Sequence, residues 1–308
     1  MLRQIIDVLI IGSGPAGLQA AIHAARKKVE VVVLGKAQQS SIYAAHVENY
    51  LCVAGVSQGH DLMTVAVDQV RRTGAEVIPE DVLTIEQDRE LFKVKIESGR
   101  NLISRTLIFA TGNARKKLRV KGEKELSGKG VSYCVDCDAN FYRKAKVAVV
   151  GNESAAVDGA ITLTRYAAEV HLVARKLAAS PVLRRELTQS SVKVHEGEWV
   201  KEIIGEKAVT GLLLESDQSL DVDGVFIELG AKGAMELAAA LGVAMDSETF
   251  SFIATNKKQE TNMSGIYAAG DIAGPPWQMA KAVGEGCVAG WEATKFAAKQ
   301  KRSEAAAA

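Results

Sequence analysis

Cysteine, proline and aromatic residues are scarce in this chain of 308 residues, which has four cysteines, five prolines and 5% Phe, Trp and Tyr. Four cysteines are too few for the disulfide framework of a small secreted protein, and 47% apolar residues exclude a disordered or collagen-like chain. The formal net charge is only +1, which gives no electrostatic reason to bind nucleic acid or an anionic membrane. No uncharged apolar run approaches the roughly 18 residues of a membrane helix, and the N-terminal residues run directly into a strand-like IIDVLII, which leaves no space for a signal peptide. We therefore expect a globular, cytoplasmic protein of two domains, with no nucleic-acid or membrane partner.

The first forty residues have the pattern of a βαβ unit. Asp7 to Ile11 is a predicted strand, the glycine-rich turn GSGPAG follows at 12–17, Leu18 to Lys28 is a predicted helix and Val29 to Leu34 a second strand. A GxGxxG turn in this setting suits a dinucleotide pyrophosphate, which binds the free N–H groups and positive dipole end of the helix. The acidic ribose ligand expected about 20 residues later is missing, and a plain tight turn is the structural alternative.

A second strand and turn, VAVVGNESAA, occupies residues 147–156 and is followed by a helical stretch and a strand at 169–173. Further strands are predicted at 82–86, 91–96, 106–110, 224–229 and 265–268, and an alanine-rich helix extends to residue 298. We expect the tail, 299–308, to be frayed. The pattern predicts an α/β protein with two Rossmann-like nucleotide-binding domains, the second inserted in the first. The predicted FAD-binding domain comprises 1–115 and 243–308, and the inserted domain 116–242, with crossovers near 113–118 and 241–243.

Two of the cysteines, Cys134 and Cys137, form a C-x-x-C pair that precedes the second turn, with Asp138 directly after it. Such a pair can cycle between dithiol and disulfide, and the spacing lowers the pKa of one thiol. Asp138 adds a carboxylate that could exchange the proton of this chemistry. Half a zinc site is the alternative, but Cys52 and Cys287 are isolated in the sequence and the five histidines are scattered, so we expect no metal. We expect Cys52 and Cys287 to be buried as small apolar residues.

Five segments together resemble the low-molecular-weight thioredoxin reductases, in order and over nearly the full length: GSGPAG at 12–17, VENY at 47–50, ATG at 110–112, CVDCD at 134–138 and YAAGDIAG at 267–274. The resemblance implies an FAD-dependent oxidoreductase, a smaller inserted NADPH-type domain that carries the dithiol, a homodimer, and thioredoxin or a thioredoxin-like protein as the substrate. The FAD contacts that it implies are Gly12, Ser13, Gly14, Pro15, Ala16, Gly17, Asn49, Thr111, Gly112, Gly270 and Asp271.

The same resemblance assigns a role to each residue of the CVDCD segment. Cys137 would lie nearest the flavin and accept its electrons, Cys134 would attack the thioredoxin disulfide, and Asp138 would be the acid/base. Because the flavin and the substrate cannot reach one pair together, the inserted domain would rotate between two arrangements.

The sequence departs from the family in its second nucleotide motif. Glu153 stands where the middle glycine of the turn should allow close approach of a pyrophosphate, and Ala174 to Leu177 stands where a His-Arg-Arg motif would bind a 2′-phosphate. At about 4 Å, like charges cost about 4 kcal/mol at an effective dielectric of about 20. Trp277, in a segment that normally carries an Arg-Gln pair beside the flavin, either covers the flavin or packs in the core, and we favour packing.

These losses resemble the ferredoxin-dependent flavin thioredoxin reductases, which implies reduced ferredoxin as the donor of electrons. The alternative is an NAD(P)H-dependent thioredoxin reductase in which Arg175 and Lys176 still hold a nucleotide. A dithiol oxidase and a flavin redox sensor without turnover are further alternatives. A run of basic residues, which we call the basic run, is a candidate docking surface for an acidic protein and has one opposing acid, Glu123. The alternative interpretation is that the basic run is a solvated linker. Its cations are Arg115, Lys116, Lys117, Arg119, Lys121 and Lys124.

Overall fold

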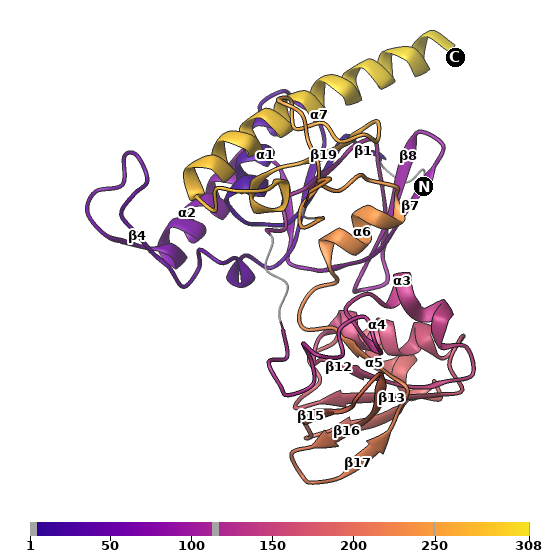
Figure 1. Cartoon of the computed structure of the whole chain (residues 1–308). Helices are drawn as coiled ribbons and strands as arrows, with labels where there is room; N and C mark the ends of the chain where they lie inside the picture. The colour runs from indigo at the N-terminus through magenta and orange to yellow at the C-terminus, as the bar shows by residue number, and fades with distance from the viewer. Residues whose placement is uncertain (1–4, 113–116, 249, 308) are drawn as a thin grey trace. The chain divides into compact units, whose positions relative to one another are not determined.

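The computed structural model describes residues 5–112, 117–248 and 250–307, and its chain forms two compact units (Figure 1). Unit 1 comprises Met1–Ile96, Asn101–Ala114 and Leu237–Ala308, and unit 2 comprises Glu97–Arg100 and Arg115–Glu236. Each unit contains a five-stranded parallel sheet with helices, so the predicted α/β class with two Rossmann-like domains is confirmed. Of the two predicted crossover segments, the first lies partly outside the described residues, at 113–116.

The central sheet of unit 1 has the strand order β19-β10-β2-β3-β6, and every neighbouring pair is parallel. Its strands are β2 (Val8–Ile11), β3 (Val31–Leu34), β6 (Glu76–Ile78), β10 (Leu107–Phe109) and β19 (Ile266–Ala268). The strands β2, β3, β10 and β19 are buried at every residue, as uninterrupted apolar runs covered on both faces should be. The glycine turn follows directly after β2, so this buried core holds the start of the turn in place.

Three helices lie wholly in unit 1: α1 (Pro15–Ala25), α2 (Gly59–Arg72) and α7 (Met279–Ala307). The helix α1 begins three residues earlier than predicted because Pro15, whose φ is already helical, occupies its first turn. The helices α1 and α7 pack against each other at two glycines of α7. A Cβ at Gly286 would lie 2.1 Å from the Ala16 carbonyl oxygen, and one at Gly290 would lie 2.3 Å from that of Ala20. The two backbones can therefore approach only where α7 has no side chain.

The other elements of unit 1 are short. A mixed sheet has the order β1-β9-β8-β7, and a two-stranded ribbon pairs β4 with β5. Their bounds are β1 (Ile5–Ile6), β4 (His46–Val47), β5 (Ser57–Gln58), β7 (Val82–Asp88), β8 (Leu91–Ile96) and β9 (Asn101–Ser104). Short helical segments are η1 (Ala37–Gln39), η3 (Gly270–Ala273) and α6 (Ala234–Ala240), the last of which begins in unit 2.

The parallel sheet of unit 2 has the order β11-β18-β12-β13-β14, and an antiparallel sheet, β15-β16-β17, accompanies it. The strands are β11 (Val131–Ser132), β12 (Lys146–Val150), β13 (Glu169–Ala174), β14 (Lys193–Glu196), β15 (Val200–Gly205), β16 (Val209–Leu214), β17 (Ser219–Asp221) and β18 (Gly224–Ile227). The helices are α3 (Val135–Asp138), η2 (Ala139–Tyr142), α4 (Ser154–Leu163) and α5 (Pro181–Thr188). The core draws residues from both sheets and is built mainly of valine, leucine and isoleucine.

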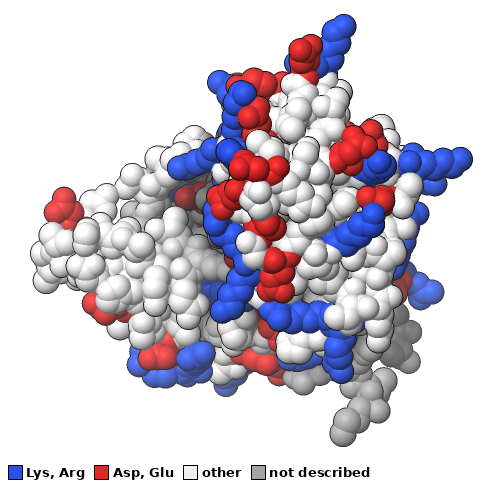
Figure 2. All heavy atoms as spheres, turned by 90° about the horizontal axis from the view of Figure 1, so that it is seen from below, with Lys and Arg blue, Asp and Glu red and all other residues white. Residues whose placement is uncertain are grey.

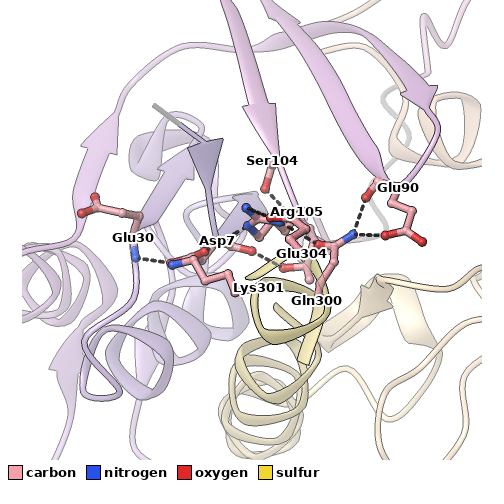
Figure 3. A network of polar contacts seen from close by, with 9 residues as sticks. Asp7, Glu30, Glu90, Ser104, Arg105, Gln300, Lys301 and Glu304 are labelled. Carbon is pink, nitrogen blue, oxygen red and sulfur yellow. Dashed lines mark hydrogen bonds and ion pairs between the residues drawn. The ribbon is translucent and has the colours of Figure 1, made fainter. Parts of the chain in front are cut away.

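The tail was expected to be frayed, and this prediction is wrong: α7 continues to Ala307. Figure 3 shows the polar network that holds its last turns. Lys301 Nζ lies 2.7 Å from Oδ2 of the fully buried Asp7, and the buried Arg105 donates to Glu304 at 2.8 Å. Gln300 donates to the carbonyl oxygen of Glu90 at 2.8 Å. These partners are far from the tail in sequence, so its charged and alanine-rich composition alone gave no sign of them.

No helix within the described ranges is both long and apolar enough to span a bilayer.

Candidate active site

The glycine turn of unit 1 lies between β2 and α1. A Cβ at Gly12, where φ is +113°, would lie 2.3 Å from the Ala110 carbonyl oxygen, and one at Gly17 would lie 1.9 Å from the carbonyl oxygen of Gly12. Both positions therefore exclude any side chain. A Cβ at Gly14 would have only the Ser40 hydroxyl nearby, at 3.3 Å. The turn is closed where it packs on the protein and open at Gly14, as close approach of a pyrophosphate to the backbone would need.

Two other loops of unit 1 meet this turn because all three follow neighbouring parallel strands. The strand β2 leads to Gly12, β10 to Ala110 and Thr111, and β19 to Gly270. A Cβ at Gly270 would lie 2.9 Å from the Ala16 Cβ, which shows how closely the last loop meets the start of α1. The structure thus brings the residues predicted from 12–17, 110–112 and 270–271 to one edge of the sheet. This edge is where nucleotides bind in open α/β sheets.

The loop at Gly270 is held by two residues that the sequence did not single out. Lys281 Nζ donates to the Gly270 carbonyl oxygen at 2.8 Å and also to that of Gly274, while Glu285 accepts from the Gly270 N–H at 2.8 Å. Lys281 and Glu285 also pair with each other at 3.0 Å, one helical turn apart on α7. An opposite-charge pair four residues apart was the signal that could have revealed them. Burial raises the pKa of Asp271 in this loop, although Lys281 opposes the shift.

Asn49, another predicted site residue, makes its hydrogen bond away from the glycine turn. Its amide donates to the Gln278 side chain at 3.0 Å, just before α7 begins. Trp277, beside it, is 54% exposed, so the prediction that this side chain packs in the core is wrong. The exposed Leu51 lies two residues after Asn49 in the same loop.

In unit 2, Cys134 and Cys137 are joined by a disulfide with their Cα atoms 5.3 Å apart. Cys134 is buried and caps the N-terminus of α3, and its Sγ accepts the backbone N–H of Cys137 at 3.0 Å. Cys137 is exposed. The structure thus distinguishes the two sulfurs by their access to solvent. A C-x-x-C pair in this form can accept two electrons and two protons to become a dithiol.

Ser132 and Asp138 form a hydrogen-bonded pair beside the disulfide. The Ser132 hydroxyl lies 2.6 Å from Oδ2 of Asp138, and the same hydroxyl accepts the Cys134 N–H at 3.1 Å. Ser132 is 5% exposed, on β11, two residues before the first cysteine. Burial and the negative charge of Asp138 raise the pKa of the nearby Tyr142. Ser132 was not identified from the sequence, in which a serine in a short strand is unremarkable.

The second glycine turn lies between β12 and α4. Glu153 is the N-cap residue of α4 with extended backbone, and a Cβ at Gly151 would lie 2.0 Å from the Glu228 carbonyl oxygen. Arg175, a candidate 2′-phosphate ligand, pairs with Glu215 at 2.6 Å and lies over the Trp199 ring at 5.3 Å. Its guanidinium therefore already has an anionic partner, while Lys176 is exposed.

The two remaining cysteines and the basic run complete the predicted features. Cys52 is exposed and Cys287 half-buried, so the prediction that both are buried is wrong. Glu123 does not oppose the basic run at the surface. It is 4% exposed, and its carboxylate accepts from the Leu118 N–H at 3.0 Å and the Tyr133 hydroxyl at 2.8 Å.

The described cations of the basic run, Lys117, Arg119, Lys121 and Lys124, are exposed, and Arg115 and Lys116 lie outside the described residues. On the face drawn in Figure 2, basic and acidic side chains are interspersed.

The chain was compared with known proteins. The family model for pyridine nucleotide-disulphide oxidoreductases matches residues 6–286. The thioredoxin reductase of Listeria monocytogenes serovar 1/2a is 36% identical, with 98% of this chain and 97% of the relative covered. Among solved structures, the atypical thioredoxin reductase of Desulfovibrio vulgaris Hildenborough matches with a TM-score of 0.83 and 29% identity over 95% of this chain and 98% of that one. A ferredoxin-flavin thioredoxin reductase of Clostridium acetobutylicum matches with a TM-score of 0.69 and 33% identity over 94% and 97%.

Proposed function

The chain belongs to the pyridine nucleotide-disulphide oxidoreductases and, within them, to the low-molecular-weight thioredoxin reductases, and from this premise we propose that it reduces thioredoxin or a thioredoxin-like protein through Cys134 and Cys137. It is an FAD-dependent disulfide oxidoreductase. The observation that carries the proposal is the Cys134–Cys137 disulfide with the Asp138 carboxylate beside it. The thioredoxin reductases to which the chain is similar supply the substrate class.

The residues of unit 1 fit the FAD that the family carries. The backbone of residues 12–17 would hold the pyrophosphate at the N-terminus of α1, where Gly14 leaves room for it. Thr111, Gly112, Gly270 and Asp271 would line the same edge, since their loops follow β10 and β19. Asn49 would contribute from its loop. When bound, FAD supplies the electrons that reduce the disulfide.

We propose unequal roles for the two sulfurs. Reduction breaks the bond between them and leaves one thiolate and one thiol after uptake of a proton. Cys134 then attacks the substrate disulfide as a thiolate, forming a mixed disulfide and releasing the other substrate sulfur, which takes the proton that the Asp138 carboxylate has accepted from the Cys137 thiol. Cys137 attacks Cys134 and frees the second substrate thiol. Because the Cys134 sulfur belongs to a residue only 7% exposed, the region must rearrange before a protein substrate can reach it.

We propose reduced ferredoxin as the donor. Three observations support this choice: Glu153 at the turn that would meet a pyrophosphate, Arg175 paired with Glu215, and similarity to a ferredoxin-flavin thioredoxin reductase. An acidic ferredoxin would dock on the exposed cations of the basic run, of which Lys121 also pairs with Glu202 at 2.7 Å. NAD(P)H remains the competing donor, since Lys176 is exposed and carries a cation toward solvent.

The test is anaerobic. Oxidised holoenzyme is mixed in turn with NADPH, NADH and photoreduced ferredoxin, and bleaching of the flavin absorbance is followed. Bleaching by ferredoxin but not by either nucleotide is the expected result. Rapid bleaching by a nucleotide at micromolar concentration overturns the choice of donor and leaves an NAD(P)H-dependent thioredoxin reductase. Peroxide formed from a small dithiol without thioredoxin reduction would instead identify a dithiol oxidase.

We also propose that two copies associate through unit 1. Its loop at 48–56 carries Leu51, 86% exposed, and Val56, 61% exposed. The Asn49–Gln278 hydrogen bond brings this loop beside the exposed Trp277. Light scattering after gel filtration should give the mass of a dimer, and a monomer at micromolar concentration would refute the proposal.

A further inference from the structure

The two residues between the cysteines both contact the loop that follows β18. Asp136 Oδ2 lies 2.5 Å from Lys232 Nζ, and the backbone N–H of Val135 hydrogen-bonds the carboxyl of Glu228. The Lys232 side chain is only 5% exposed and Glu228 is 4% exposed. The segment that contains Glu228 and Lys232 lies nearly one hundred residues along the chain from the disulfide. It therefore supplies buried ionisable groups that contact the two residues between the cysteines. The disulfide chemistry proposed above uses neither of them.

Lys232 faces acidic groups from three elements. These are Asp136 on α3, Asp158 on α4 at 3.9 Å, and Glu228 on its own loop. Burial alone would lower the pKa of Lys232, but these acids, with Asp136 foremost, raise it, so the lysine is protonated. A buried ammonium is costly unless it is paired at close range, and the short contact with Asp136 meets that condition.

Glu228 is a second acid beside Lys232 and is almost fully buried. Its pKa is raised well above the ordinary range of a glutamate by burial and by the neighbouring Glu236, with Lys232 acting in the opposite direction. Its Oε1 is buried without a hydrogen-bond partner, a state that costs less for a neutral carboxyl than for a carboxylate. The short ion pair of Lys232 is thus with Asp136, whose side chain is 37% exposed.

Asp136 directly precedes Cys137 and follows Cys134 by two residues. A carboxylate close to a thiol raises the thiol pKa, and a cation lowers it. We propose that Lys232 is a positioning residue for the dithiol: its charge offsets that of Asp136 and so sets the fraction of the reduced pair that is thiolate near neutral pH. The inference rests on the proposed thiol chemistry and deepens it. The other polar groups around the pair are Ser132, Asp138 and Tyr142.

Opposite changes of charge should have opposite effects. Lys232→Met leaves Asp136 uncompensated and is expected to raise the pKa of the attacking thiol by about one unit. Asp136→Asn removes the shortest ion pair of Lys232 and leaves Asp158 at 3.9 Å, and it is expected to lower the thiol pKa by a similar amount. The double variant should return close to the parent value. A merely structural role would not produce shifts of opposite sign that cancel.

The measurement is the rate of iodoacetamide alkylation of the holoenzyme, reduced with a phosphine, as a function of pH, with the alkylated cysteine identified by mass spectrometry. Lys201→Met, which removes a cation from an exposed ion pair of the same unit with Asp217, is the matched control and should leave the profile unchanged. If Lys232→Met does not fold, Asp136→Asn and Lys232→Arg still decide the matter, because the first must lower the thiol pKa and the second must preserve it. Shifts of the same sign, or none, in folded variants overturn the inference. The readout needs neither thioredoxin nor an electron donor, so failure of the proposed function would be seen separately, in turnover.

Discussion

The hydroxyl of Ser132 joins the carboxylate of Asp138 to the backbone of Cys134, since it lies 2.6 Å from Oδ2 of the acid and 3.1 Å from the nitrogen of the cysteine. The contact fixes the acid/base candidate relative to the candidate nucleophile. Because the hydroxyl oxygen accepts the Cys134 N–H, the single hydroxyl proton of Ser132 is donated to the Asp138 carboxylate.

Ser132→Ala should reduce thioredoxin turnover about tenfold, because Asp138 loses an ordered donor worth roughly 1.5 kcal/mol. The loss should fall on kcat rather than on the KM for thioredoxin, since Ser132 is buried and not part of the exposed surface. Ser132→Thr keeps the hydroxyl and should recover most of the activity. Equal activity of the alanine variant and the parent would show that Asp138 does not depend on this contact.

The cysteine variants should differ in what they retain. Cys134→Ser leaves the exposed Cys137 able to react with the flavin site, whereas Cys137→Ser leaves Cys134 able to form a stable mixed disulfide with thioredoxin. Both should reduce thioredoxin only at the background rate, because each breaks the dithiol. Non-reducing gels and the flavin spectrum distinguish them. Near-normal turnover by either variant would contradict the dithiol mechanism.

Gly14→Glu should abolish flavin binding while the chain still folds. The glycine has space around it, with only the Ser40 hydroxyl within 3.3 Å of a Cβ, so the harm comes from a negative charge at the place of the pyrophosphate. The ratio of flavin to protein absorbance measures the loss, and circular dichroism checks the fold. A full complement of flavin in this variant would reject the assignment of the turn.

Arg105→Met should lower the free energy of unfolding by about 3 kcal/mol, because it leaves the buried Asp7 with less compensation. The free energy of unfolding should also depend on pH. The hydrogen bond from Arg105 lowers the pKa of Glu304, so this contribution is complete above the unfolded pKa of about 4.3 and is lost as the pH falls through the lower, folded value. Urea unfolding at neutral and acidic pH measures both effects. Arg302→Met, a change of the same kind on an exposed residue of α7, is the control and should have little effect.

The sequence predicted features whose partners are close along the chain. The turn at 12–17 and the Cys134–Cys137 pair depend on local spacing, and the structure forms both the turn and the disulfide. The Lys232–Asp136 pair and the anchoring of Lys301 by Asp7 depend on distant segments, which no local pattern reveals. Composition was also misleading at Trp277, because an apolar side chain does not by itself report whether a neighbour covers it.

The pairing of β10 with β19 has a consequence for synthesis on the ribosome. Leu107 is registered with Ile266, and all of unit 2 from Arg115 to Glu236 is translated between them. Unit 2 therefore leaves the ribosome before β19, the edge strand of the central sheet of unit 1, and before α7, the helix that packs on α1. During synthesis, the edge of β10 that pairs with β19 stays unpaired until after unit 2 has been translated, and we expect unit 2 to fold before the sheet of unit 1 is complete.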